Sequence, residues 1–199
     1  MTSFTDWSEP EFLALDLETT GLKPDSGEII EIGVVGFSSG RVVGRWGQLV
    51  RPERLPGDSI VSLTGIDPTE LRASPSIGEV LPAVLGRLAG RVVVAHNAPF
   101  DRSFLAAAAR RLGLVFPRME WVDTLWLARL LLPGGGGYSL PALKARLGIE
   151  LPSHRAVPDA EAAGRLLLGL LPRLSALGPA ERTLVSSRIP PGLWRWERI

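Results

Sequence analysis

The stretch FLALDLETTG, residues 12–21, places two carboxylates inside an apolar run. A β-strand directs residues i and i+2 to the same face, so Asp16 and Glu18 should point the same way from a strand that is otherwise typical of a core. Burying two like charges side by side is costly unless a cation or a proton compensates them. The alternative is an edge strand with a solvated polar face. The residues Thr19-Thr20-Gly21 follow the strand directly and predict a turn. We therefore expect the end of the strand to remain accessible as a functional site.

Two further acidic residues lie far along the chain, each at a junction between predicted elements. Asp101 ends the segment HNAPFD, just after the apolar run 92–95, and Asp159 ends the segment HRAVPD. Four carboxylates drawn from three segments suit a hard divalent cation, since Mg²⁺ prefers a few carboxylates together with water and phosphate oxygens. The chain has no cysteine and two histidines, which argues against a soft zinc site.

Composition bounds the class of protein. With 199 residues, 45% hydrophobic and 22% charged, the chain can build one sizeable globular core. The absence of cysteine is compatible with a reducing cytoplasm, and residues 1–7 show no signal-peptide pattern, so we expect a cytoplasmic protein. The longest apolar stretches, such as 166–171, are too short to span a bilayer, so no membrane partner is expected. A net charge of +1 means that nucleic acid would be held by local charge or metal bridging.

Periodicity predicts an α/β fold with a mixed central sheet flanked by helices. Three strands come first, with Ser38-Ser39-Gly40 as a hairpin turn between the second and third. The predicted strands are 12–17, 28–37, 41–50 and 91–95. The predicted helices are a short one near 68–72 and longer ones at 76–88, 102–112, 123–132, 139–147 and 158–174. Antiparallel strands followed by alternating helices and strands favour one mixed sheet.

The domain organisation is simple. Residues 1–174 are expected to form one domain, and residues 175–199 a C-terminal tail that packs on the domain or binds a partner. Trp194 and Trp196 in that tail could stack on bases or dock onto protein. Gly134–Gly137 is a flexible loop rather than a phosphate cradle, because it lacks the Gly-Lys-Ser/Thr ending of a P-loop.

The three acidic segments together resemble the DEDDh (DnaQ-like) family of 3′→5′ exonucleases, with most similarity to its proofreading branch, the epsilon subunit of bacterial DNA polymerase III. The matching segments are DLETTG at 16–21, HNAPFD at 96–101 and HRAVPD at 154–159. Similar stretches between them are 63–66, 122–125 and 139–149. The resemblance covers residues 10–174 in chain order, and it implies an RNase H-like fold.

The resemblance also implies a role for each acidic residue. Asp16 would bridge two Mg²⁺ or Mn²⁺ ions, Glu18 and Asp159 would hold the ion on the nucleophile side, and Asp101 the ion on the leaving-group side. His154 would be the general base, which suits an imidazole that titrates near neutrality. Two ions can clamp the attacking and leaving oxygens of an in-line phosphoryl displacement.

Five residues match positions that the family uses to bind the substrate. Thr19 and Leu22 would seat and wedge the terminal nucleotide, Asn97 and Phe100 would line its pocket, and Thr64 belongs to the similar stretch LTGI. One departure is Pro158, where relatives often carry a small flexible residue. Proline is tolerated at a helix start, so a stiffer loop is expected rather than a lost site.

Other polar residues receive structural interpretations. We expect His96 to hold Asn97 or a backbone carbonyl, and Asp123 to be a helix N-cap. The paired Arg110 and Arg111 should form a solvated face.

The leading function is a metal-dependent 3′→5′ exonuclease acting on DNA with a 3′ end, single-stranded or frayed, in proofreading or repair. Four carboxylates do not encode the sugar of the substrate, so an RNA-trimming exonuclease is an alternative. A catalytically inactive binding module is another, although the complete acidic set argues against it. Association with a DNA polymerase and a free-standing repair role are both open.

Overall fold

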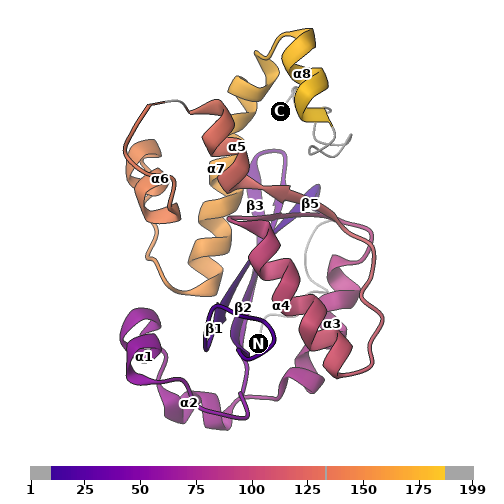
Figure 1. Cartoon of the computed structure of the whole chain (residues 1–199), viewed down its shortest axis with the longest axis vertical. Coiled ribbons are helices and arrows are strands. Elements are labelled where there is room, and N and C mark those ends of the chain that lie inside the picture. Colours follow the sequence, from indigo (N-terminus) through magenta and orange to yellow (C-terminus); the bar gives the residue numbers. More distant parts are fainter. Residues whose placement is uncertain (1–9, 133, 187–199) are drawn as a thin grey trace.

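A computed structural model describes residues 10–132 and 134–186 of the chain (Figure 1). Five strands form one sheet with helices on both faces. The strands are β1 (Phe12–Thr19), β2 (Ile29–Ser38), β3 (Arg41–Leu49), β4 (Val92–Ala95) and β5 (Glu120–Asp123). The helices are α1 (Asp58–Thr64), α2 (Pro68–Ala73), α3 (Ile77–Leu88), α4 (Ala98–Arg111), α5 (Thr124–Leu131), α6 (Leu140–Leu147), α7 (Ala156–Ser175) and α8 (Pro179–Val185). In this part of the chain no helix has the length and apolar character to cross a membrane.

The sheet is mixed, as predicted. Its strand order is β3-β2-β1-β4-β5. The pairs β1–β2 and β2–β3 are antiparallel, whereas β1–β4 and β4–β5 are parallel. The hairpin between β2 and β3 turns at Ser39 and Gly40, which both take positive φ, at 49° and 70°. Positive φ at both central residues matches the right-handed strand twist. Strand β1 therefore lies in the middle of the sheet.

Alternation along β1 divides the core into two halves. Leu13, Leu15 and Leu17 face a cluster that includes residues of α3 and α4. Phe12 and Ala14 face the opposite cluster, which includes residues of α5, α6 and α7. Figure 1 shows α7 and α4 on opposite sides of the sheet. Because even-numbered residues share a face, Asp16 and Glu18 belong to the side that α7 covers.

Helix α7 packs unusually close to the sheet because glycines leave it room. A Cβ on Gly33 of β2 would overlap the backbone of Ala156 and lie 2.5 Å from the amide nitrogen of Val157. A Cβ on Gly47 of β3 would lie 2.5 Å from Cγ2 of Val157. Gly164 of α7 likewise leaves room for the Phe37 ring, because a Cβ on Gly164 would overlap that ring. The first turn of α7 therefore rests directly on β2.

Several element boundaries differ from the sequence-based prediction. Helix α4 begins at Ala98 instead of residue 102, since Asn97 adopts a left-handed conformation and Pro99 suits the first turn. Helix α7 likewise begins two residues earlier than predicted. Pro82 does not interrupt α3. Helix α1 and strand β5 are additional elements.

Part of the predicted tail is helical. Val185 of α8 is buried in the cluster that contains α7 residues. Arg182 donates from Nε to the Leu177 carbonyl at 3.0 Å and from Nη2 to the Ser175 carbonyl at 2.5 Å. These contacts attach α8 to the end of α7. Trp194 and Trp196 lie outside the described residues.

Candidate active site

Three of the four predicted acidic residues meet at the end of β1. Asp16 and Glu18 share a face of the strand, and Asp159 comes from the first turn of α7. One carboxylate oxygen from each lies within 4.8 Å of the other two. We call these three residues the carboxylate cluster. The glycine contacts of α7 with β2 and β3 bring Asp159 to this position, far from Asp16 in sequence.

Asp101 lies beside the carboxylate cluster rather than within it. It is buried on the first turn of α4. Burial raises the pKa of Asp101 well above its usual range, although hydrogen bonds from the backbone of Asp101 itself and of Leu17 act to lower it. Its charge is the largest electrostatic contribution to the raised pKa of Asp16, so the two carboxyl groups lie close enough to repel.

The negative charge of Asp16 and Glu18 is poorly compensated. Burial, followed by repulsion from Asp101, Glu18 and Asp159, raises the pKa of Asp16 well above its usual range. Burial, followed by repulsion from Asp159 and Glu31, raises the pKa of Glu18 to about 7. Carboxyl groups with such neighbours hold protons or attract a cation. Carboxylate oxygens are the donors that hard divalent cations prefer.

His154 reaches the cluster through its backbone. Its N–H donates to Oδ2 of Asp159 at 2.6 Å. The residue takes a φ of 61°, a left-handed conformation that few non-glycine residues adopt, although asparagine, aspartate and histidine adopt it more often than the others. Its side chain is half-buried. The segment between α6 and α7 is therefore fastened to the Asp159 carboxylate.

Glu31 is a buried carboxylate that sequence analysis missed. It lies directly opposite Glu18 in the β1–β2 register. It accepts from Arg155 Nη2 at 2.9 Å and from the Ala156 backbone N–H at 3.0 Å. Glu31 thereby attaches the start of α7 to β2. The available signal was a single acidic residue within the otherwise apolar run 29–37.

Four of the five predicted substrate-binding residues line one hollow beside the carboxylate cluster. The hollow holds about 190 Å³ and contains Glu18 in its wall. Leu22 and Leu63 are large apolar side chains at its edge that are 85% and 52% exposed. Leu63 and Ile60 come from α1, which was not predicted. The full lining is Leu17, Glu18, Thr19, Gly21, Leu22, Ile60, Leu63, Thr64 and Phe100.

Asn97, the fifth predicted residue, lies elsewhere. It has a φ of 70° ahead of α4, and its backbone N–H donates to Oδ1 of Asp123 at 3.0 Å. The same oxygen accepts from the Leu125 N–H at 3.0 Å, so Asp123 is the N-cap of α5, as expected. Asp123 thus joins the starts of α4 and α5.

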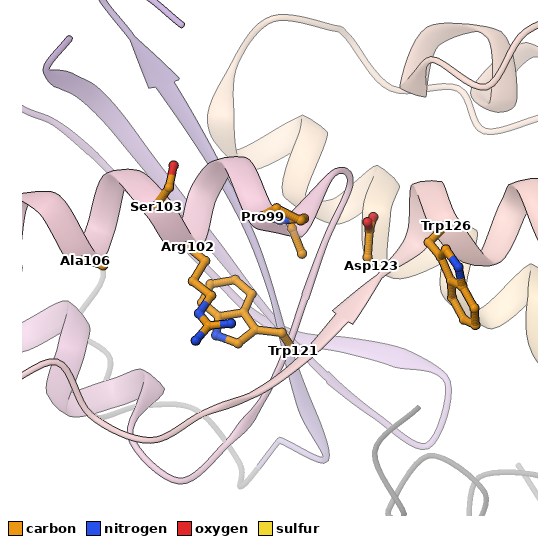
Figure 2. A pocket seen from close by; sticks show the side chains of 8 residues that line it. Pro99, Arg102, Ser103, Ala106, Trp121, Asp123 and Trp126 are labelled. Atoms are coloured by element: carbon orange, nitrogen blue, oxygen red, sulfur yellow. The ribbon is translucent and has the colours of Figure 1, made fainter. Parts of the chain in front are cut away.

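A larger hollow of about 440 Å³ lies between α4 and β5 (Figure 2). Trp121 and Trp126 line it on either side of Asp123, together with Pro99 and Arg102. None of the three cluster carboxylates contributes to its wall. This hollow is larger than the one that Glu18 lines. The acidic residues needed for chemistry nevertheless adjoin the smaller hollow, so we take the smaller one as part of the candidate active site.

His96 has a structural role. Its Nε2 lies 3.0 Å from the Tyr138 carbonyl, and its Nδ1 lies 3.0 Å from Oγ1 of Thr124. A carbonyl only accepts, so in the neutral ring Nε2 carries the hydrogen. Burial lowers the pKa of His96, which favours this neutral form. The predicted contact with a backbone carbonyl is present.

Comparison with known proteins agrees with this arrangement. The family model described as exonuclease (RNase T) matches residues 13–167. A DNA polymerase III of the PolC type from Caldanaerobacter subterraneus subsp. tengcongensis is 39% identical over 171 residues, covering 85% of this chain and 12% of that protein. A putative bifunctional exonuclease/endonuclease protein of Mycobacterium tuberculosis is 36% identical over 193 residues, covering 92% of this chain and 30% of the relative.

Solved structures show the same fold. Exonuclease X in complex with 5′ overhanging duplex DNA is 30% identical with a TM-score of 0.67, covering 85% of this chain and 95% of that one. E. coli Exonuclease I in complex with a dT13 oligonucleotide has a TM-score of 0.70 at 22% identity, covering 83% and 42%, and supports the fold alone. A five-stranded mixed sheet with this carboxylate cluster defines a nuclease of the RNase H-like class. The chain belongs to the exonuclease family, as the sequence motifs predicted.

Proposed function

We propose that the chain is a metal-dependent 3′→5′ exonuclease that hydrolyses phosphodiester bonds at the 3′ ends of DNA. The main support is the position of the carboxylate cluster, which adjoins a hollow with apolar walls at the open end of β1. A nuclease acting on chain ends needs hard-cation ligands next to a small pocket for one terminal nucleotide. Glu18 belongs to both parts.

The residues present fit a divalent cation. Asp16, Glu18 and Asp159 supply oxygen donors, and the raised pKa values of Asp16 and Glu18 indicate charge that a cation would relieve. These three would hold one Mg²⁺ or Mn²⁺ ion, and Asp16 with Asp101 would hold a second. Bound ions would neutralise the negative charge that develops on the phosphate oxygens.

The chain's own side chains would do the rest. His154 would accept a proton from the attacking water at an imidazole nitrogen, and the fastening of its backbone to Asp159 supports that assignment. Leu22, highly exposed at the rim of the hollow, would wedge against the last base, and Phe100 would contact the terminal nucleotide. Thr19, whose hydroxyl donates to the Gly21 carbonyl at 2.7 Å, would keep that turn open.

DNA is favoured over RNA by the comparisons. Exonuclease X, at 30% identity, is a DNA complex, and several relatives are DNA polymerases. The matched region is 12% of the PolC-type relative, so proofreading beside a polymerase is one proposed setting and repair of free ends the other. Either setting would present a single-stranded or frayed 3′ terminus.

The experiment compares four substrates of one sequence: single-stranded DNA, a matched primer duplex, a primer with a mismatched 3′ end, and RNA. Strands labelled at the 5′ end should shorten stepwise with Mg²⁺ or Mn²⁺, and single-stranded or mismatched DNA should shorten fastest. Asp16→Asn keeps the shape of the side chain and should retain no more than about 1% of the rate. Loss of the 5′ label as a mononucleotide, a faster rate on RNA, or full activity in chelator would contradict the proposal.

A further inference from the structure

Lys144 is a buried cation at the carboxylate cluster that the proposed chemistry leaves unused. It belongs to α6, where Leu140, Leu143 and Leu147 mark one helical stripe. Lys144 comes four residues after Leu140 and so lies on the same stripe, and 5% of its surface is exposed. A lysine is almost never buried to this degree without partners.

The ammonium of Lys144 has partners for all three of its donors. Nζ donates to the Pro152 carbonyl at 2.7 Å and to Oγ of Ser153 at 2.7 Å. The third partner is Oδ1 of Asp159 at 3.4 Å, an ion pair in which both side chains are about nine-tenths buried or more. An amide would bring two donors and no charge, so a lysine suits these three acceptors better than glutamine or asparagine.

These contacts enclose the backbone of His154. Lys144 binds the two residues that precede His154, and the carboxylate that accepts from Lys144 also accepts the His154 N–H through its other oxygen. On the following side, Arg155 donates to Glu31 of β2. The left-handed conformation of His154 is thus fixed by anchors on both sides.

We propose that Lys144 is a positioning residue of this site, whose ammonium holds residues 152–153 and the Asp159 carboxylate in fixed relation and so fixes His154 at the cluster. The inference rests on the proposed function in assigning catalytic work to His154 and Asp159. It does not require Lys144 to touch substrate. Loss of the ammonium should therefore reduce turnover more than binding of DNA.

The experiment replaces Lys144 with methionine, which keeps the length and apolar stem of the side chain but donates no hydrogen bond. Arg146→Met is the matched control, because it removes an exposed cation from the same helix. Lys144→Met should lower kcat by about 10–100-fold, the usual cost of losing a group that orients a metal ligand. KM for single-stranded DNA should stay within about twofold of the parent, since no substrate contact is lost. Arg146→Met should change neither value.

A second measurement is independent of activity. The chain has two histidines, so the imidazole Cε1–H signals in an NMR spectrum are few and can be assigned. In metal-free protein, Lys144→Met should shift the His154 signal and leave the His96 signal in place, because His96 is held by Thr124 and Tyr138. Parental kcat together with an unmoved His154 signal would overturn the inference, as would a change confined to KM.

Two further outcomes are distinguishable. If Lys144→Met does not fold, Ser153→Ala removes one of the three acceptors while Lys144 keeps its other two. It should shift the His154 signal in the same direction, and an unmoved signal would overturn the inference. If the parent protein has no exonuclease activity, the proposed function fails, and the His154 signal alone then decides whether Lys144 holds the segment.

Discussion

His154 combines an uncommon backbone conformation with a proposed chemical role, so the substitution that tests it must preserve the backbone. Asparagine tolerates left-handed φ, whereas alanine would add strain at 61°. We expect His154→Asn to lower kcat by about 10²–10⁴-fold, the usual contribution of a positioned acid–base group. Single-turnover rates with Mn²⁺ measure this, and the thermal midpoint should be unchanged.

The other histidine is the natural control. His96 is held by two hydrogen bonds in a largely buried position. His96→Asn should cost about 1–3 kcal/mol of unfolding free energy by leaving buried groups unpaired. Equal loss of turnover in both variants, with equal loss of stability, would remove the proposed distinction between the histidines.

Glu18 makes the stability of the metal-free protein depend on pH. Its pKa is about 7 in the folded protein, against an ordinary value of 4.5, so the folded state binds the proton more tightly than the unfolded chain does. Stability contributed by that proton is fully present below 4.5 and is lost as pH rises through about 7. We expect the thermal midpoint in chelator to fall over this interval, and Glu18→Gln to flatten the fall.

Glu79 offers a comparison for that experiment. It belongs to the exposed capping box of α3, and hydrogen bonds from Ser76 lower its pKa. Glu79 therefore titrates below the interval in which Glu18 acts, and Glu79→Gln should leave the slope between 4.5 and 7 unchanged. A metal-free protein whose midpoint rises with pH across the interval would contradict the assigned role of Glu18.

At the residue scale, the sequence predicted those site residues that belong to motifs with a recognisable spacing. Strand periodicity placed Asp16 and Glu18 on one face, and Asp101 and Asp159 were grouped with them by their positions at element junctions and by the resemblance. The structure brings Asp16, Glu18 and Asp159 together and places Asp101 beside them. Glu31 and Lys144 were missed because each is one charged residue within an apolar pattern. Their partners, Arg155 and Asp159, lie in other elements, so only the tertiary structure identifies them.

At the element scale, Gly33 controls how closely α7 approaches β2. It pairs with Asp16 in the sheet and lies under Ala156 and Val157 of α7. Gly33→Ala should push the first turn of α7 outward, which overpacks the interface at a cost of about 1–3 kcal/mol. Asp159 would move away from Asp16, so kcat should fall as well. Chemical denaturation and the nuclease assay measure the two effects.

A second glycine gives the matched control. Gly86 is an exposed position of α3, and a Cβ there would meet nothing within 4 Å. Gly86→Ala should stabilise the protein by about 0.5–1 kcal/mol, because alanine loses less backbone entropy in a helix. If Gly33→Ala behaves like Gly86→Ala, close packing of α7 does not set the geometry of the cluster.

Element prediction succeeded for the long periodic runs and for the short elements α2 and β4, but it missed the short elements α1 and β5. The runs that became β1, β2 and α3 carry clear patterns, and their positions were predicted. Strand β5 has four residues and is recruited by pairing with β4, which a local pattern cannot show. Helix α1 is seven residues long and follows a segment rich in proline and glycine. Helix α1 lines the hollow beside the carboxylate cluster, and β5 lines the larger hollow.

At the scale of the whole molecule, cation binding should add to the stability of the fold because the cluster joins β1 to α7. An ion present at 100 times its Kd contributes about 2.7 kcal/mol. For a chain of this size that corresponds to roughly 5–11 °C in the thermal midpoint. Mg²⁺, Mn²⁺ and Ca²⁺ should all raise the midpoint, and Asp16→Asn should remove most of the increase.

Calcium should separate binding from hydrolysis. It takes oxygen ligands at about 2.3–2.6 Å, whereas magnesium requires about 2.0–2.1 Å, and in-line displacement tolerates little misplacement of the reacting oxygens. Calcium should therefore retain DNA in a gel shift without supporting degradation, and should inhibit when added over magnesium. Calcium-driven cleavage at the magnesium rate would refute the proposed use of the cluster.

The order of β1 and α7 in the chain has a consequence for synthesis on the ribosome. Strand β1, with Asp16 and Glu18, is translated before α7, and its carboxylates gain Asp159 only when α7 has been translated and has packed across β1 and β2. A nascent or prematurely terminated chain that ends before residue 156 carries the first acidic residues without the last. The cell would thus encounter the complete cluster only in a chain whose translation has passed α7, and unfinished products would not be free nucleases.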